Sequence, residues 1–166
     1  MKALRAFLLL TTLALSACGF HLRGSTPQDV QFAFKTLYLK VPGETLFVAD
    51  LRRALAAHEV ALTDTPEQAD LVLEVLSEQS SKNILSLSGS GRVREYELRY
   101  TVALRAYDAQ RIDWLSAGEV QLTRLLTFDD EQLLAKEQEE TQLYKDMRAD
   151  AVAQTLRRLN RAKPRE

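Results

Sequence analysis

Cysteine and histidine are nearly absent from this chain of 166 residues, which contains one cysteine and two histidines. A disulfide framework and a Cys/His zinc site are therefore excluded, because each needs several such side chains. Six glycines and four prolines are too few for a disordered or collagen-like chain. The 22 basic and 23 acidic residues nearly cancel, whereas a nucleic-acid-binding domain would be strongly basic. The composition predicts one globular domain with no cofactor and no nucleic-acid partner.

The first 17 residues are typical of a signal peptide rather than of a folded domain. Lys2 and Arg5 supply its positive charges, and the uncharged residues 6–15 are too few to span a bilayer, which takes about 20 residues. The segment Leu15-Ser16-Ala17-Cys18 resembles a bacterial lipobox, in which cleavage precedes the cysteine and the cysteine becomes acylated. The alternative is an ordinary secretory signal that happens to precede a free cysteine.

Acylation of Cys18 would attach the whole domain to a membrane, because lipoproteins of this type carry three acyl chains and stable anchoring needs more than one. Gly19 follows the cysteine, where an aspartate commonly retains such proteins at the inner membrane. The expected location is therefore the outer membrane, on its periplasmic side. Lys2 and Arg5 leave with the signal, so the mature chain has 20 basic and 23 acidic residues and a net charge of −3. An anionic ligand then needs a local group of bases.

Apolar periodicity after a tether over residues 18–33 divides residues 34–160 into six elements. Their order is strand, helix, strand, strand, strand and helix, over residues 34–41, 46–58, 70–78, 92–106, 112–126 and about 129–160. This order predicts an α+β fold with two helices packed on one face of a four-stranded, largely antiparallel sheet. Residues 82–90, which are rich in serine, are expected to form a mobile connection, and residues 161–166 a basic C-terminal tail.

The two long strands and the last helix carry further signals. Ser116 and Gly118 interrupt the second long strand and predict a bulge. Asp129 is expected to cap the last helix, and Phe128 to pack against Leu133. At 1.5 Å per residue the helix is about 45 Å long, so one end should overhang the sheet. The apolar side chains expected on its buried face are Leu133, Leu134, Tyr144, Met147, Ala151, Leu156 and Leu159.

Residues 18–24, which read Cys-Gly-Phe-His-Leu-Arg-Gly, resemble the start of the LptE (RlpB) family of lipopolysaccharide-assembly lipoproteins. Two later motifs are similar to those of the family. Arg94-Glu95-Tyr96 opens the first long strand. An aromatic-acidic step at residues 128–129 is followed by Leu-Ala-Lys at residues 134–136, at the entry to the last helix. The resemblance covers essentially the mature chain in its order of elements.

The resemblance implies an outer-membrane lipoprotein that binds the β-barrel LptD and plugs it in a 1:1 complex. It also implies that the protein assists assembly of that barrel and binds lipopolysaccharide during its delivery to the cell surface. An alternative from a different functional class is an accessory lipoprotein of an ABC-type lipid transporter that bridges the envelope membranes. Such a protein would share the lipobox and the α+β body but has no reason to carry the motif at residues 18–24.

Basic residues are the candidates for contact with lipopolysaccharide. The resemblance assigns this role to the lysine that matches Lys136 and to an arginine whose position here is Gly89, so Arg92 and Arg94 are the nearby candidates to replace it. Arginine suits phosphate because its planar fork donates two parallel hydrogen bonds. The residues alone also allow a structural interpretation. Lys136 would pair with acids on its own helix, and Arg92, Arg94 and Arg99 with glutamates across strands.

Nothing in the sequence predicts catalysis or a metal site. His21 lies in the tether and His58 ends a helix, and neither belongs to a motif with a nucleophile. The acidic residues 129–131 are explained by the helix macrodipole, which favours negative charge in a first turn. The same dipole, together with solvation of the tail, accounts for the basic residues near the C-terminus, which are Arg157, Arg158, Arg161, Lys163 and Arg165.

We expect Cys18 to be the acylated N-terminal residue of the mature protein. Replacing it by serine should abolish membrane attachment and leave the fold intact, because residues of a tether contribute little to a core. Mass spectrometry of the protein purified from its native membrane measures both the first residue and its modification. An unmodified Cys18 would contradict the prediction, and so would cleavage at another position.

Overall fold

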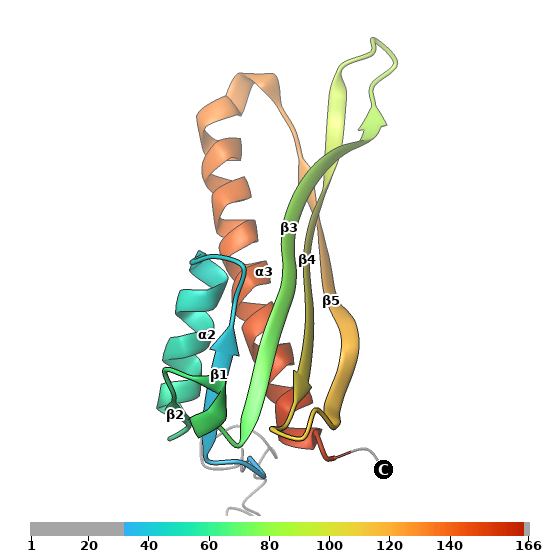
Figure 1. Cartoon of the computed structure of the whole chain (residues 1–166). Coiled ribbons are helices and arrows are strands. Elements are labelled where there is room, and N and C mark those ends of the chain that lie inside the picture. Colours follow the sequence, from blue (N-terminus) through green and yellow to red (C-terminus); the bar gives the residue numbers. More distant parts are fainter. Residues whose placement is uncertain (1–31, 165–166) are drawn as a thin grey trace, which may run out of the picture.

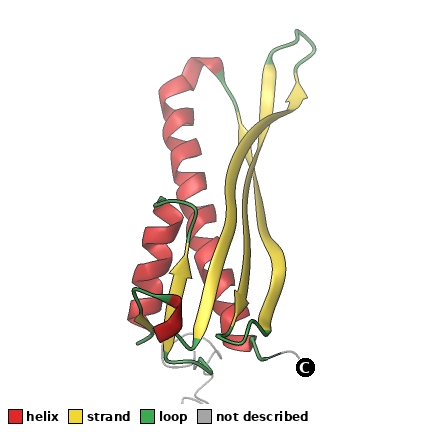
Figure 2. Cartoon of the chain, in the orientation of Figure 1, coloured by secondary structure: helices red, strands yellow, loops and turns green. Residues whose placement is uncertain are grey.

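The computed structural model describes residues 32–164, so the signal peptide, Cys18, His21 and most of the predicted tether lie outside the described residues. Both helices lie on one face of a single sheet (Figures 1 and 2). Neither of them is long and apolar enough to cross a membrane. The elements are β1 (Thr36–Lys40), α2 (Leu46–Ala57), β2 (Ala61–Leu62), the 3₁₀ turn η2 (Pro66–Gln68), β3 (Leu71–Leu87), β4 (Val93–Tyr107), β5 (Asp113–Thr127), the 3₁₀ turn η3 (Asp130–Gln132) and α3 (Leu133–Arg161).

The sheet has five strands in the order β2-β1-β3-β4-β5 and is mixed. β1 pairs in parallel with both β2 and β3, whereas β3, β4 and β5 are antiparallel neighbours. The α+β class and the placement of both helices on one face are confirmed, but the prediction of four largely antiparallel strands is wrong. The missed strand consists of two exposed residues, Ala61 and Leu62, which are too few to show an alternating pattern. The crossover through α2 returns the chain in the direction of β1, which makes this edge parallel.

The core lies between the sheet and the two helices. α2 begins at Leu46 because the Thr45 hydroxyl accepts a hydrogen bond from the Val48 amide at 3.2 Å, which caps the helix. α3 is joined to α2 by Arg148, whose Nε donates to Asp50 Oδ2 at 2.8 Å. The buried apolar side chains of α2, β1 and β3 are Phe47, Val48, Leu51, Leu55, Leu37, Leu39, Leu71, Leu73 and Val75.

A bulge in β3 turns a carboxylate toward the helices. The register shift between Val75 and Ser77 places Glu78 opposite Val102, on the face that carries the core. There the Tyr100 hydroxyl donates to Glu78 Oε1 at 2.6 Å, and a threonine hydroxyl at the start of α2 donates to the second oxygen. Burial and the adjacent carboxylate raise the pKa of Tyr100 far above its ordinary value, so this hydroxyl stays a donor.

The mobile connection predicted over residues 82–90 is wrong, because β3 continues through Leu87. Residues in this extension pair with β4, for example Lys82 with Leu98 and Ile84 with Tyr96, and the register shifts between Ile84 and Ser86 and again before Leu87. The chain then reverses in a short turn, where the Ser88 amide donates to the Arg92 carbonyl at 2.7 Å. The side chains of the extension are largely exposed, so its hydrophobic pattern gives no sign of the strand, which backbone hydrogen bonds hold in place.

The predicted bulge in the second long strand is confirmed. Leu104 pairs with Gly118 and Ala106 with Leu115, so two residues of β5, Ser116 and Ala117, lie opposite one residue of β4. The extra residue bends β5 at its first third, which increases the local twist of the sheet.

The last helix matches the prediction in its extent but not in its first turns. Asp129 Oδ1 accepts a hydrogen bond from the Glu131 amide at 3.0 Å and caps η3, and α3 then runs for 29 residues. Leu133 and Leu134, predicted to be buried, are 52% and 71% exposed. Phe128 packs edge-on against Tyr96 instead of against Leu133, at 5.3 Å between ring centroids. The helix does not overhang the sheet, because the β3–β4 hairpin reaches past its start (Figure 1).

The buried face of α3 makes a clear prediction about stability. Leu98 is fully buried beneath it, so Leu98→Ala should lower the free energy of unfolding by about 2–5 kcal/mol through lost burial and the cavity left behind. Leu134→Ala is the matched control, since this side chain is 71% exposed and its loss should change stability by less than about 0.5 kcal/mol. Urea unfolding measures both values. Similar losses for the two variants would contradict the assignment of the core.

Candidate functional site

The end of the molecule opposite to β2 and the end of α3 brings together the β3–β4 hairpin, the end of β5 and the start of α3 (Figure 1). We call this the distal end and define it as residues 82–96 and 125–140. A backbone hydrogen bond from the Phe128 amide to the Arg94 carbonyl (2.8 Å) and the pairing of Glu95 with Thr127 fix its geometry. It contains a hollow of about 550 Å³, lined by Ser86, Leu87, Arg94, Glu95, Thr127 and Phe128.

Lys136 lies next to this hollow. Its Nζ donates to Thr127 Oγ1, a residue of the lining, at 2.9 Å and to Glu139 Oε2 at 2.8 Å. The side chain is only 16% exposed. The predicted pairing with an acid on its own helix is therefore confirmed, but the lysine is also held against the end of β5. This second contact fixes the ammonium group beside a residue that lines the hollow.

Arg94 and Arg92 differ in their positions. Arg94 is exposed and lines the hollow, whereas Arg92 is exposed in the turn of the hairpin. Cross-strand pairing with Glu95 or Glu97 is not found for either arginine within residues 32–164. Glu95 accepts a hydrogen bond from the serine opposite it on β3 (2.7 Å), and Glu97 pairs with Arg99 along the same strand (2.7 Å). Arg94 therefore lines the hollow, Lys136 contacts one of its lining residues, Thr127, and Arg92 is not part of the lining.

A second lysine of the distal end was missed by the sequence analysis. Lys82 Nζ lies 4.3 Å from the centroid of the Tyr96 ring and 6.0 Å from that of Phe128, and it forms an ion pair with Glu140 at 2.6 Å. A cation above an aromatic face is attracted to the ring quadrupole, and the ion pair ties the hairpin to α3. The residue lies in the segment predicted to be a mobile connection. The hydrophobic pattern of this segment gives no sign of a strand, so the position of Lys82 follows only from the pairing of β3 with β4.

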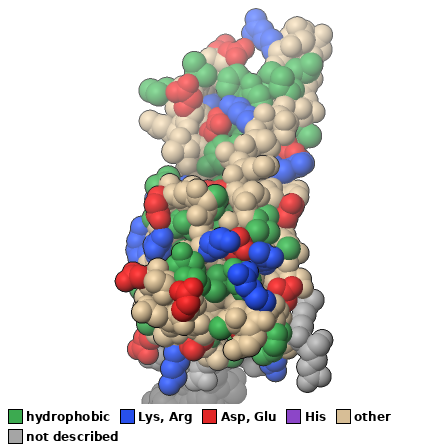
Figure 3. Space-filling model, in the orientation of Figure 1, with side chains coloured by type: hydrophobic (Ala, Val, Ile, Leu, Met, Phe, Trp, Pro, Cys, Tyr) green, Lys and Arg blue, Asp and Glu red, His purple; other side chains and the backbone are tan. Residues whose placement is uncertain are grey.

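Exposed apolar side chains surround these bases. Figure 3 shows hydrophobic side chains gathered over the distal end, beside acidic and basic ones. Six of the ten large hydrophobic side chains that the described residues expose lie here, and they are Ile84, Leu85, Leu87, Leu125, Leu133 and Leu134. A concentration of exposed apolar surface in one place marks an interaction site more often than scattered residues do.

The chemistry of the distal end is that of an amphiphile-binding surface. Lys136, Lys82 and Arg94 can donate charge-assisted hydrogen bonds to an anionic group, and the neighbouring leucines can contact an apolar one. Among residues 32–164 there is no group of His, Cys, Asp and Glu side chains that could hold a metal ion.

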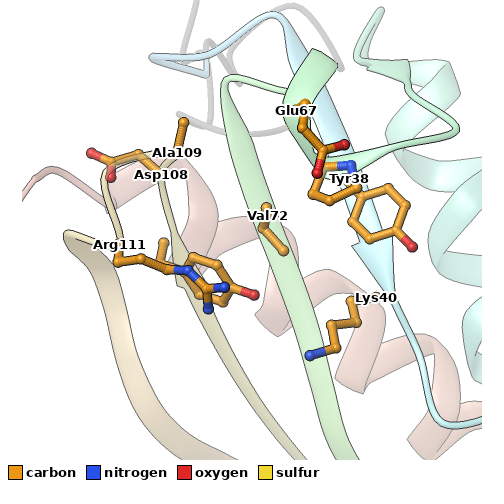
Figure 4. A pocket seen from close by; sticks show the side chains of 9 residues that line it. Tyr38, Lys40, Glu67, Val72, Asp108, Ala109 and Arg111 are labelled. Carbon is orange, nitrogen blue, oxygen red and sulfur yellow. The ribbon is translucent and has the colours of Figure 1, made fainter.

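A second hollow, of about 340 Å³, lies on the opposite half of the molecule, on the sheet face that no helix covers (Figure 4). Lys40 from β1 and Arg111 from the β4–β5 turn extend toward the same space. Glu74 pairs with Lys40 at 2.8 Å and with Arg105 at 2.7 Å, and these two cations lower the pKa of its carboxyl group. This hollow lacks the exposed leucines that surround the bases of the distal end, so it is a weaker candidate for an amphiphile.

Residues 34–159 match the family model of LptE, which is described as lipopolysaccharide assembly. A curated relative, the LPS-assembly lipoprotein LptE of Pectobacterium atrosepticum, is 30% identical over 157 residues, which cover 90% of this chain and 80% of the relative.

Two solved structures share the fold. Lipoprotein B of Nitrosomonas europaea, an uncharacterised protein solved by NMR in solution, is 41% identical with a TM-score of 0.71, and the similarity covers 84% of this chain and 88% of that one. The crystal structure of the rare lipoprotein B of Shewanella oneidensis is 26% identical with a TM-score of 0.66, over 74% of this chain and 91% of that one.

Proposed function

The chain belongs to the LptE family of lipopolysaccharide-assembly lipoproteins, and from this premise we propose a role for its two ends. The protein is anchored through acylated Cys18 at the periplasmic side of the outer membrane. It binds the β-barrel LptD in a 1:1 complex, assists its assembly and plugs it. Through the distal end it binds lipopolysaccharide during delivery to the cell surface, and it catalyses no reaction.

The observation that supports lipopolysaccharide binding best is the position of two bases among exposed leucines. Arg94 lines the hollow, and Lys136 donates a hydrogen bond to Thr127 of its lining. Lipopolysaccharide carries phosphate groups beside acyl chains, so its lipid end needs cations and apolar surface within a short distance. The mature chain has a net charge of −3, which gives an anion no long-range attraction. Binding must therefore rely on a local group of bases of this kind.

The uncovered face of the sheet supports a barrel as the partner. Both helices occupy the opposite face, and the central part of the free face carries small polar side chains such as Ser77, Gln79, Thr101, Gln121 and Thr123. The lumen of a large outer-membrane barrel is polar, so a polar sheet face fits against its wall without burying unpaired apolar area. No feature of the described residues favours the alternative, an accessory lipoprotein of an ABC-type transporter.

Charge reversal at the hollow tests the lipid contact. Arg94→Glu should weaken binding of purified lipopolysaccharide about tenfold or more, because a charge-assisted hydrogen bond contributes about 1.5–3 kcal/mol. The loss should grow at low salt, where repulsion is less screened. Lys136→Gln should also weaken the binding of lipopolysaccharide. Titration of lipopolysaccharide into the detergent-solubilised protein measures the affinity, and thermal unfolding checks the fold.

Arg53→Glu is the matched control, since this arginine lies on α2 and its side chain is 76% exposed. The affinity of this variant for lipopolysaccharide should stay close to that of the unmodified protein. An equal loss for Arg53→Glu and Arg94→Glu would mean that overall charge decides binding, and unchanged affinity for Arg94→Glu and Lys136→Gln would remove the distal hollow as the lipid site.

Co-expression with LptD tests the partner. If the domain is enclosed by the barrel, protease should cut it slowly in the complex and faster when it is alone, with the exposed turn at residues 88–92 among the sites cut only in the free protein. Limited proteolysis of the co-purified complex and of the free lipoprotein, followed by mass spectrometry, gives the comparison. Identical cleavage patterns, or the absence of a co-purifying barrel, would contradict the proposed complex.

A further inference from the structure

α3 ends at the end of the molecule where the described chain begins (Figure 1). Four basic side chains gather at this end. They line two adjoining hollows of about 390 and 220 Å³, which share Arg158 and Arg161. Neither lining contains an acidic side chain, although the chain as a whole is slightly acidic. We call the four bases the terminal basic patch, which consists of Arg157, Arg158, Arg161 and Lys163.

Most of this charge is not used within the domain. Arg158 donates to the Glu119 carbonyl of β5 at 2.7 Å, so its position is fixed by the sheet. The other three bases form no ion pair within residues 32–164. The helix dipole explains Arg158 and Arg161, which lie in the last turn of α3. It does not explain Arg157, which precedes that turn, or Lys163, which follows the helix.

The N-terminal side of the described chain starts beside the same patch. The ring of Phe34 lies edge-on to that of Trp114 at 6.5 Å, and Trp114 lines the larger of the two hollows. Thirteen residues separate Phe32 from Cys18. Such a segment reaches at most about 50 Å when fully extended. An acyl anchor on Cys18 therefore holds the start of the described chain, beside the terminal basic patch, within about 50 Å of the membrane surface.

We propose that the terminal basic patch binds anionic phospholipid headgroups of the leaflet that holds the acyl anchor. This inference rests on the anchor of the proposed function and adds a second, electrostatic attachment that fixes which end of the domain touches the bilayer. Each base close to an anionic surface raises partitioning about fivefold, and an acyl anchor combined with a basic patch is a common pair of membrane signals. Trp114 fits this position, because tryptophan favours the boundary between apolar and polar layers.

Trp114 also supplies the measurement, because it is the only tryptophan of the chain. The mature acylated protein is incorporated into vesicles of phosphatidylcholine alone or of phosphatidylcholine with phosphatidylglycerol, each with and without lipids brominated close to the headgroup. We expect strong quenching of Trp114 fluorescence by the brominated lipid in the anionic vesicles and weak quenching in the neutral ones. High salt should reduce the difference, since the Debye length falls from about 10 Å at 0.1 M to about 3 Å at 1 M.

Two variants with the same change in net charge separate the patch from overall charge. Reversing the three unpaired bases, as Arg157→Glu, Arg161→Glu and Lys163→Glu together, should reduce quenching in anionic vesicles to the level of neutral vesicles. The control reverses three exposed bases elsewhere, which are Arg53, Arg99 and Lys145, and should keep the quenching of the unmodified protein. Replacing Arg157, Arg161 and Lys163 together by glutamine removes charge without adding repulsion, and it should also reduce quenching in anionic vesicles. Thermal unfolding establishes that each variant is folded.

Three results would overturn the proposal. They are equal quenching in neutral and anionic vesicles, quenching that survives both changes at the patch, and an equal loss in the control variant. The anchor is measured separately by flotation with neutral vesicles at high salt, which depends on the acyl chains alone. A protein that fails to float lacks the anchor of the proposed function, and quenching in anionic vesicles at low salt still reports on the patch.

Discussion

The antiparallel pairing of β3 with β4 is the constraint on which both ends of this molecule depend. Its register runs from Val72 opposite Tyr107 to Leu87 opposite Val93. The first part of β3 is buried beneath the helices, whereas beyond Glu78 the strand is held mainly by its hydrogen bonds to β4. β3 and β4 stay paired beyond the buried core, and this extension places Arg94 close to the start of α3. The separation of a distal hollow from a terminal basic patch follows from this length.

Those parts of the fold that bury apolar side chains could be predicted from the sequence. Four features have a local physical cause that is visible in the residues. They are the apolar stripe of α2, the alternating side chains of β4, the bulge in β5 and the cap at Asp129. The short strand β2 and the extension of β3 could not be predicted, because both depend on pairing between distant segments. β2 is two residues long, and the extension of β3 exposes its side chains, so neither produces a hydrophobic period. Leu133 and Leu134 match a helical stripe, but α2 is too short to provide a surface that would cover them.

The candidate site could be predicted only in part, because some of its residues belong to local motifs and others depend on pairing between distant segments. Lys136 and Arg94 belong to motifs that resemble those of a family. In the structure Arg94 lines the hollow, and Lys136 contacts Thr127 of its lining. Lys82 carries no motif, and its position above Tyr96 follows from the register of β3 with β4. The absence of carboxylate partners for Arg94 within the described residues also depends on tertiary structure, because Glu95 and Glu97 are close in sequence but engaged elsewhere.

The uneven distribution of the core has a consequence for local stability. Few buried apolar contacts hold the distal end, where an aromatic pair, the ion pair of Lys82 with Glu140 and the hydrogen bond from the Tyr144 hydroxyl to the Ser81 carbonyl (2.9 Å) join α3 to the hairpin. Opening this end therefore costs less free energy than unfolding the whole domain, and its backbone amides exchange hydrogen with solvent faster than those of Leu71 or Leu73. If the proposed ligand makes the distal end more rigid, the entropy lost reduces its affinity, which favours exchange of the bound molecule over its permanent retention.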